Sequence, residues 1–437
     1  MNWIETTVGE YCPFVYGKSL PKTQRTEGDI PVFGSNGCVD YHNKSYVNGP
    51  GIIIGRKGSV GAVHLSVEPF WPIDTSFYVE KESIDELKFT YYLLKSLGLK
   101  GMNSDSAVPG LNRENAHALP IRIPEKIQDR EKLGQWISVY DSKIELNRQT
   151  NQTLEQIAQA IFKSWFVDFD PVRAKIAANT AGENAQRAAI AVISGKNQAA
   201  LDQLEQQYPA QYQQLQATAD LFPDNLIDSG LGEIPDGWEV VGFKDIIRKY
   251  IDNRGKTPPT AESGIPLLEV KHLPDGSIKP SLNTSKYVDI ETFNSWFRAH
   301  LEAEDILIST VGTIGRICMV PKGVKVAIAQ NLLGMRFQRE KVSPYFMYYQ
   351  MDSLRFRHDI DARLVVTVQA SIKRKDLETI DLLAPPVALQ NEFEKLILPF
   401  IEILQSNQSI ELASTRDALL PKLLSGELSI DTSETEF

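Results

Sequence analysis

Two hydrophobic patterns alternate along the 437-residue chain, and the first predicts compact domains that contain strands. It consists of short β-branched runs separated by Gly, Pro and Asn, a pattern typical of strands between turns. Helices are expected near residues 84–97 and 344–357, so each stretch predicts a mixed α and β globule. The expected strands include residues 51–54, 77–79 and 121–123 in the first globule, and residues 306–308 and 325–328 in the second.

The second pattern is the apolar stripe of an amphipathic helix, and it follows each globule. Between Pro124 and Phe169, apolar residues recur three or four positions apart without an internal proline, and a similar stripe runs from Pro386 to Leu428. Each segment has about 40 residues and therefore predicts a helix roughly 60 Å long. The residues expected at the contact between helices, or with a partner, are Leu154, Ile157, Ile161, Trp165, Leu412, Leu419 and Leu423.

The two stripes have two interpretations. A single amphipathic helix more often packs onto its own globule, whereas two helices of similar length, each following a copied globule, favour packing against one another. Polar residues interrupt both stripes at Asn147, Asn151, Asn407 and Gln408, and such residues fix the register of paired helices at some cost in stability. We therefore expect the two helices to pair.

The two globules are copies of one domain. Residues 51–63 read "GIIIGRKGSVGAV" and residues 305–317 read "DILISTVGTIGRI", so apolar and glycine positions match. Residues 111–124 ("LNRENAHALPIRIP") likewise match residues 372–385 ("IKRKDLETIDLLAP"). A period near 240 residues is a domain duplication, because solenoid repeats are far shorter.

These patterns predict an α+β fold with two similar mixed α/β domains, separated by two long helices that pack against one another. The connector between the halves is rich in Ala and Gln, and Gly195 and Pro209 divide it into short helical pieces. Its function is not evident from the sequence. The expected boundaries are a first domain at 1–124, a first helix at 125–170, the connector at 171–236, a second domain at 237–385, a second helix at 386–428 and a tail at 429–437.

Composition narrows the class of protein. The three cysteines form no C-x-x-C pair, and no apolar run reaches the roughly 18 residues of a membrane helix, so we expect a soluble cytoplasmic protein that does not enter a membrane. The formal net charge of −10 argues against a polyanionic partner. However, the acidic residues concentrate in 125–239 and 386–437, which leaves the two globules near neutral or basic.

The sequence contains no motif for catalysis. The glycine stretch lacks the spacing of a phosphate loop or of a dinucleotide fingerprint. The six histidines occur singly, and neither a metal-binding pair nor a G-x-S-x-G nucleophile is present. We therefore expect a binding protein and no catalytic residues or metal site in this chain.

Basic residues in both globules predict contact with nucleic acid. At the glycine turns, backbone N–H groups would approach phosphates closely, or the glycines would simply form a tight strand turn, and the sequence leaves both interpretations open. The candidate DNA-binding residues are Lys18, Lys22, Arg25, Arg56, Lys57 and Arg113 in the first domain, and Arg254, Lys256, Lys271, Arg316, Lys373, Arg374 and Lys375 in the second.

Two further segments resemble a known family. Residues 153–175 ("TLEQIAQAIFKSWFVDFDPVRAK") and 414–428 ("STRDALLPKLLSGEL") are similar to the helix ends of the specificity subunit of type I restriction-modification enzymes. The resemblance covers nearly the whole chain, as globule, helix, globule and helix. The long Ala/Gln-rich connector at 174–222 departs from it, so the spacer length does not carry over.

The resemblance implies that the two long helices form an antiparallel, pseudo-twofold symmetric coiled coil, and that each target-recognition domain reads one half of a split double-stranded DNA site. It also implies two modification (methyltransferase) subunits and two restriction (endonuclease and translocase) subunits as partners. S-adenosylmethionine, ATP and Mg would belong to those partners, with no cofactor bound by this chain. Two alternatives are a helical adaptor that binds only protein and an enzyme with a nucleotide at the glycine turn.

Overall fold

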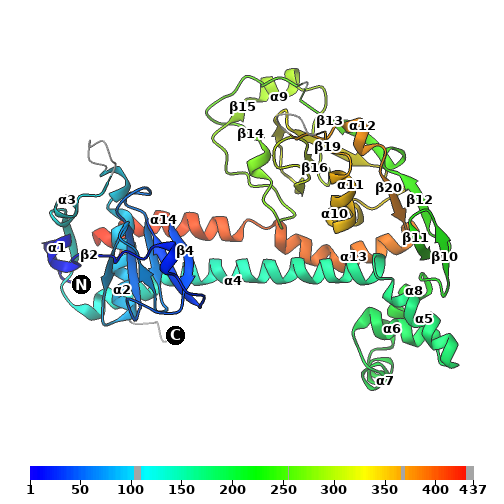
Figure 1. Ribbon diagram of the computed structural model, residues 1–437, viewed down its shortest axis with the longest axis horizontal. Coiled ribbons are helices and arrows are strands. Elements are labelled where there is room, and N and C mark those ends of the chain that lie inside the picture. Colours follow the sequence, from blue (N-terminus) through cyan, green and yellow to red (C-terminus); the bar gives the residue numbers. More distant parts are fainter. Residues whose placement is uncertain (103–109, 254, 366–369, 430–437) are drawn as a thin grey trace. The chain divides into compact units, whose positions relative to one another are not determined.

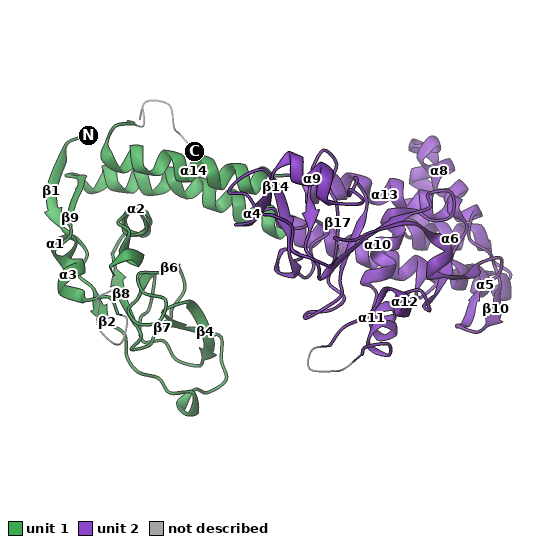
Figure 2. Ribbon diagram, turned by 90° about the horizontal axis from the view of Figure 1, so that it is seen from above, with its two compact units in different colours: residues 1–149, 407–437 green, residues 150–406 purple. Residues whose placement is uncertain are grey.

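The computed structural model describes residues 1–102, 110–253, 255–365 and 370–429. They form two compact units: Met1–Gln149 with Asn407–Phe437, and Thr150–Ser406 (Figure 2). The helix α4 (Ile127–Phe166) is continuous across this division, so its first part belongs to unit 1 and its last part to unit 2. Within the described residues, no helix combines the length and apolar character needed to cross a membrane.

Unit 1 is built on a four-stranded antiparallel sheet in the order β2-β8-β5-β6 (Figure 1). Its central strand β5 is buried along its whole length. Both faces of the strand therefore carry apolar residues, which explains why its sequence is a continuous apolar run and not an alternation of apolar and polar residues. The strands are β2 (Val15–Tyr16), β8 (Ser76–Glu80), β5 (Gly51–Gly55) and β6 (Val63–Ser66). A second sheet contains β4 (Gly37–His42), β3 (Ile30–Gly34) and β7 (Trp71–Pro72), and β1 (Trp3–Thr7) pairs with β9 (Pro120–Pro124).

The helices of unit 1 begin at conventional caps. Ser83 accepts a hydrogen bond from Glu86 N at the start of α2 (Ile84–Ser96), and Asn112 accepts one from Asn115 N at the start of α3 (Arg113–His117). The other short helices are α1 (Val8–Tyr11) and the 3₁₀ turns η1 (Lys22–Gln24) and η2 (Leu99–Gly101).

The globule of unit 2 repeats the sheet order of unit 1, as β13-β19-β16-β17. These strands are β13 (Ile247–Ile251), β19 (Leu332–Phe337), β16 (Ile306–Ser309) and β17 (Ile317–Met319). A second sheet contains β15 (Tyr287–Val288), β14 (Ile265–Leu268) and β18 (Ala327–Ile328), and β12 (Glu239–Gly242) pairs with β20 (Asp381–Ala384). The helices are α9 (Ile290–Trp296), α10 (Pro344–Asp352), α11 (Leu354–Asp361) and α12 (Arg374–Leu377), with 3₁₀ turns η3 (Phe243–Ile246) and η4 (Val270–His272).

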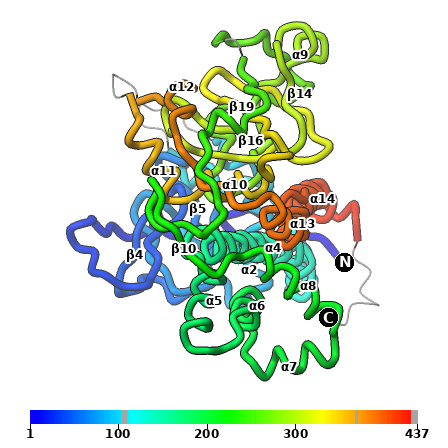
Figure 3. The backbone as a smooth tube through the Cα atoms, turned by 90° about the vertical axis from the view of Figure 1, so that its right-hand side faces the viewer, coloured from blue at the N-terminus to red at the C-terminus, as the bar shows by residue number. Residues whose placement is uncertain are grey.

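In unit 2 the last part of α4 packs against α13 (Val387–Gln405), and Figures 1 and 3 show the two helices side by side. The ring of Phe393 lies 5.8 Å from that of Phe162 and 5.4 Å from that of Phe166, centroid to centroid. Trp165 is only 3% exposed and contacts the same phenylalanine. The apolar stripe is therefore buried between helices, as predicted.

In unit 1 the first part of α4 packs against α14 (Gln408–Ser425). Leu423 is fully buried in one cluster with Leu133 and Ile137 of α4, and Arg416 forms an ion pair with Asp141. In each unit the chain runs along α13 or α14 in the direction opposite to its direction along α4, so the pairing is antiparallel. This arrangement confirms the predicted coiled coil.

The second long helix was predicted as one element over 386–428, and this prediction is wrong. The chain leaves α13 at Ser406, whose backbone is extended (φ −63°, ψ 153°), and α14 begins at Gln408. Side chains of Ser and Asn compete with the helix for backbone hydrogen bonds, so Ser406 and Asn407 favour a break there. Pro399 and Pro421 lie inside the two helices, away from the break.

The stripe residues differ in burial. Trp165 and Leu423 are buried, while Leu154, Ile161, Leu412 and Leu419 are partly buried. Ile157 is 41% exposed, so much of its side chain lies outside the contact between helices.

The connector forms four short helices, which Figure 3 shows as one group, followed by a hairpin that the sequence did not predict. Gly195 ends α6 in a left-handed conformation (φ 65°), and Pro209 occupies the first turn of α8. These elements are α5 (Asp170–Ala181), α6 (Ala185–Ser194), α7 (Gln198–Gln207), α8 (Pro209–Asp220), β10 (Leu226–Ser229) and β11 (Gly232–Pro235).

Glu155 is a buried polar residue of α4 in unit 2. It is 6% exposed, and neither carboxylate oxygen has a hydrogen-bond partner within the described part of the chain. Burial, and then the charge of Asp352, raise the pKa of Glu155 from 4.5 to about 7. The protonated form is therefore the one that this contact accommodates.

We expect Glu155 to make unit 2 less stable as pH rises. The unfolded chain ionises Glu155 near pH 4.5 and the folded chain only near pH 7, so its contribution to stability falls by up to about 3 kcal/mol across this window. Urea unfolding between pH 5 and 8 should show that Glu155→Gln removes this loss, while the exposed Glu402→Gln on α13 keeps it. Parallel stability curves for wild type and Glu155→Gln would contradict the assignment.

The packing of α14 on α4 predicts a second stability effect. Leu423→Ala should lower the free energy of unfolding of unit 1 by about 2 to 5 kcal/mol, because it empties a fully buried site. Ile410→Ala in the same helix is the matched control, since Ile410 is 61% exposed and its loss should change stability by less than about 0.5 kcal/mol. Equal denaturant midpoints for the two variants would show that the contact contributes nothing.

Candidate nucleic-acid interface

The glycine stretch of each unit forms the turn between the central strand and the next strand of the sheet. In unit 1, Gly55 N donates to Ala62 O (2.8 Å) and Gly61 N donates to Gly55 O (2.8 Å). In unit 2, the same two bonds join Ser309 with Arg316 (2.9 Å) and Gly315 with Ser309 (3.0 Å). The duplication therefore extends to individual hydrogen bonds.

The glycines serve the geometry of this turn. Gly58 and Gly61 have φ values of 79° and 69°, and Gly312 and Gly315 have values of 82° and 78°, a region that other residues rarely adopt. A Cβ atom on Gly61 would lie 2.3 Å from the backbone carbon of Leu99. A side chain at this position would therefore displace the neighbouring backbone.

Several backbone N–H groups of the unit 1 turn are already bonded within the chain. Arg56 N and Lys57 N both donate to Thr75 O, at 2.9 and 3.1 Å. A phosphate would have to compete with this carbonyl, so the hydrogen bonding favours the tight turn over the phosphate cradle.

Hydrogen bonds beyond the turn define which residues are equivalent. Leu111 N donates to Arg56 O (2.8 Å), and Ile372 N donates to Thr310 O (3.0 Å). Arg56 is thus the counterpart of Thr310, and counting from Leu111 and Ile372 makes Arg113 the counterpart of Arg374.

The equivalence also places Arg316. Arg316 is a candidate DNA-binding residue beside the second glycine stretch, but it does not occupy the position of Arg56 or Lys57. Its backbone bond to Ser309 instead makes it the counterpart of Ala62, and Val311 stands where unit 1 has Lys57. The gap-free alignment of residues 51–63 with 305–317 gives the same pairs, and the hydrogen bonds confirm it.

The predicted basic residues of unit 1 fall into two groups. Lys18, Lys22 and Lys57 are exposed, and Lys18 Nζ lies 5.3 Å from the centre of the Tyr46 ring. Arg25 differs, because its side chain is 9% exposed, pairs with Asp40 (2.8 Å) and also donates to Leu20 O. Its guanidinium is therefore used within the fold.

The basic residues of unit 2 show a similar division. Lys256, Lys373, Arg374 and Lys375 are exposed, and Lys271, also exposed, is paired with Glu269 (3.0 Å). Arg316 is half-buried and donates to Leu273 O (3.4 Å). Arg254 lies outside the described residues.

Two tyrosines that the sequence did not single out lie against these cations. Tyr16, on edge strand β2, is 46% exposed, and the guanidinium carbons of Arg56 and Arg113 lie 5.1 and 5.0 Å from its ring centre. Tyr250, on the equivalent strand β13, lies 3.9 Å from the guanidinium carbon of Arg374. Comparison of the two halves of the sequence missed these tyrosines, because they are not equivalent residues. When β2 and β13 are matched by their strand pairing, Tyr16 and Tyr250 stand two positions apart.

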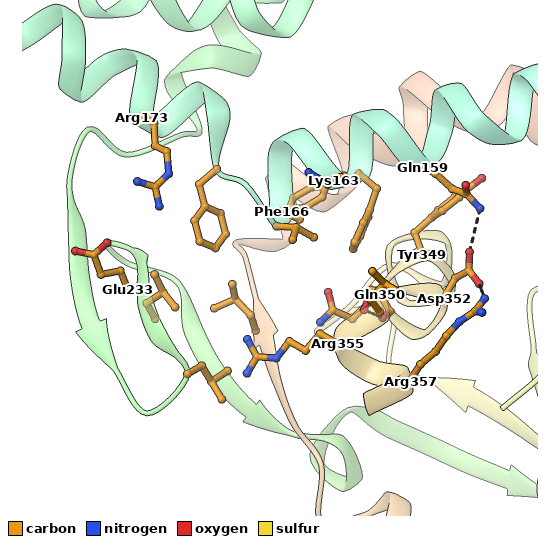
Figure 4. A pocket seen from close by; sticks show the side chains of 18 residues that line it. Gln159, Lys163, Phe166, Arg173, Glu233, Tyr349, Gln350, Asp352, Arg355 and Arg357 are labelled. Atoms are coloured by element: carbon orange, nitrogen blue, oxygen red, sulfur yellow. Dashed lines mark hydrogen bonds and ion pairs between the residues drawn. The ribbon is translucent and has the colours of Figure 1, made fainter. Parts of the chain in front are cut away.

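Unit 2 also contains a cavity of about 700 Å³, shown in Figure 4. Its wall includes the end of α4, helices α10 and α11 and the β10–β11 hairpin. Asp352 accepts hydrogen bonds from Arg357 (2.7 Å) and Gln159 (3.1 Å), while Phe166 and Tyr349 supply apolar surface. The sequence gave no signal for this cavity, because its walls come from distant segments.

The charged groups of the cavity include both cations and carboxylates, among them Arg173, Arg355 and Asp352. Lys163, which also lines the cavity, is paired with Asp168. Across all described residues, no cluster of three or more His, Cys, Asp or Glu side chains is suited to hold a metal ion.

Comparisons with known proteins agree with the fold. Residues 1–156 match the family model of the type I restriction modification DNA specificity domain. The chain is 31% identical to the type I restriction enzyme HindI specificity subunit of Haemophilus influenzae, over 73% of this chain and 71% of that protein. It is 25% identical to the MjaIX specificity subunit of Methanocaldococcus jannaschii, over 79% of this chain and 69% of that protein.

A solved structure shares the architecture. The S subunit of a type I restriction-modification system from M. genitalium superposes with a TM-score of 0.55 at 15% identity, covering 99% of this chain and 97% of that one. With the duplicated sheet, the paired helices and the sequence matches together, the chain belongs to the specificity subunits of type I restriction enzymes, which supply DNA sequence recognition and not catalysis.

Proposed function

We propose that each α/β domain of this chain reads one half of a bipartite DNA site, and that the paired helices set the unread gap between the halves. The observation that carries this proposal is a double repetition. Both units have the same order of strands in the sheet, and both have the same pair of hydrogen bonds in the turn that follows the central strand. Two copies of one reading surface suit two half-sites. Within each unit, the sheet shares a hydrophobic cluster with α4, so a helix is fixed to each reading domain.

Contact with DNA in this proposal comes from side chains on the two domains. Exposed lysines such as Lys57, Lys256 and Lys373 neutralise phosphates, which positions the domain on the duplex without reading its sequence. The net charge of −10 does not oppose this, because exposed charges beyond about 10 Å are screened at physiological salt.

As a specificity subunit, the chain acts with modification and restriction subunits. We infer two of each, with one modification subunit docked on the helices of each unit. Support comes from apolar side chains that the helices leave exposed in both units. These are Val139, Leu146 and Ile410 in unit 1, and Ile157, Leu396 and Ile403 in unit 2. S-adenosylmethionine, ATP and Mg belong to those partners in this proposal.

Methylome sequencing tests the proposed function. Cells that carry this chain with its modification subunits should methylate one bipartite motif, with two specific half-sites around a gap of fixed length. Cells with the modification subunits alone are the control. If methylation is absent or follows a single uninterrupted motif, bipartite reading is wrong, and absence together with intact assembly would favour the protein-binding adaptor.

Lys57 gives a test of phosphate contact. Lys57→Ala should weaken binding of the assembled complex to every DNA sequence alike, and should reduce the slope of log affinity against log salt by about one unit. Lys322→Ala, an exposed lysine of unit 2, serves as the control. Salt titrations with cognate and unrelated duplexes measure both effects. An unchanged slope for Lys57→Ala would place this lysine outside the interface.

A further inference from the structure

Besides the backbone arrangement, the two domains repeat a side-chain contact between an arginine and a tyrosine. Arg113 and Arg374 are counterparts by the bonds of Leu111 and Ile372, and each is the first residue of a short helix, α3 or α12. Each guanidinium lies against a tyrosine of the edge strand of its sheet. The tyrosines stand at different positions of that strand, so the pairing is conserved between the copies although the sequence positions are not.

In unit 1 the arginine is oriented from two sides. Its guanidinium lies on Tyr16, and Nε and Nη2 donate to Glu114 Oε1 at 3.2 and 2.9 Å. The Arg113 side chain is 37% exposed, so one side of its fork faces solvent. Arg56 lies over the same ring and donates to Asp74 O (2.9 Å), which adds a second cation beside the tyrosine.

In unit 2 the corresponding contact is closer. The guanidinium carbon of Arg374 lies 3.9 Å from the Tyr250 ring centre, and Nε donates to Glu378 Oε1 (2.8 Å). The side chain of Arg374 is nevertheless 58% exposed. Both arginines thus combine a fixed guanidinium plane with access to solvent.

We propose that Arg113 and Arg374 are the specificity-determining residues that each read a base of their own half-site, and that Tyr16 and Tyr250 are the residues that position them. This inference rests on the proposed bipartite function. Arginine presents a planar fork of donors that matches the two acceptors on the major-groove edge of guanine. Holding the plane on an aromatic ring reduces the entropy lost when that fork binds.

A contact with a base and a contact with a phosphate have different effects on binding when they are removed. A phosphate contact lowers affinity for all sequences when it is removed, whereas a base contact lowers discrimination at one base pair. Loss of one bidentate contact should reduce discrimination at that pair roughly 5- to 150-fold. The two arginines should affect different half-sites, because they belong to different domains.

The test uses the full chain with its modification subunits and determines the methylated motif in cells. Arg113→Ala should make one base pair of one half-site degenerate, and Arg374→Ala should do the same in the other half-site. Lys95→Ala is the matched control, because Lys95 also lies over a tyrosine, 5.0 Å from Tyr91, but outside the duplicated pair. Its motif should equal that of wild type.

The outcomes separate this inference from the proposed function. If wild type shows no bipartite motif, the proposed function fails. If wild type shows one and both alanine variants keep it, or lose methylation uniformly at all sites, base reading by these arginines is wrong. If an alanine variant does not assemble, Arg113→Lys and Arg374→Lys decide, since lysine keeps the charge and loses the fork: a degenerate base pair supports the proposal and an intact motif overturns it.

The tyrosines have their own readout. Tyr16→Leu should relax the same base pair as Arg113→Ala, while Tyr16→Phe, which keeps the ring face, should restore the wild-type motif. Tyr250→Leu and Tyr250→Phe should behave likewise in the other half-site. If the leucine variants lower stability but leave the motif intact, the tyrosines are structural and do not position the arginines.

Discussion

Burial of the apolar stripe of α4 is the interaction on which the rest of the structure depends. In unit 2, Ala158 and Phe162 of α4 belong to the same hydrophobic cluster as Ile306 and Ile308 of the central strand. In unit 1, Leu133 and Ile137 share a cluster with the equivalent strand residues Ile52 and Ile54. Neither domain therefore completes its core without its part of the helix, and each glycine turn starts from a strand that is packed into a core shared with α4.

The two parts of α4 meet their domains with different polar contacts. In unit 1, buried Glu86 accepts a hydrogen bond from Arg130 Nε (2.8 Å), so a charged pair is satisfied at the contact. In unit 2, Glu155 is buried against Tyr348, Tyr349 and Asp352 without a hydrogen bond within the described residues. Charge burial without a partner is costly, so this contact is the one that responds to pH.

Sequence patterns predicted the features that depend on local periodicity. The stripe from Ile127 to Phe166 and the buried run at Ile52–Ile54 follow directly from helix and strand periods. The break at Ser406 was missed because the apolar stripe continues on both sides of it. The β10–β11 hairpin was missed because the Ala/Gln-rich helical pattern before it was extended too far.

Site residues were harder to assign for a different reason. Arg25 and Lys57 look alike as basic residues in a globule, and only tertiary contacts show that Arg25 is committed to Asp40. The contact of Arg113 with Tyr16 joins segments almost 100 residues apart, and no local pattern records it. The sequence therefore shows which residues are charged, whereas tertiary packing determines which of those charges are free to contact a ligand.

The two copies of the domain combine a similar backbone turn with different side chains. Two turn bonds recur in both units, yet Arg56 is replaced by Thr310 and Lys57 by Val311 at equivalent positions. Because backbone hydrogen bonds and not these side chains hold the turn, such replacements change the exposed surface without unfolding the turn. Specificity then varies through side chains, while the shared helix core stays the same, and the Arg–Tyr pair is the part of the surface that both copies have kept.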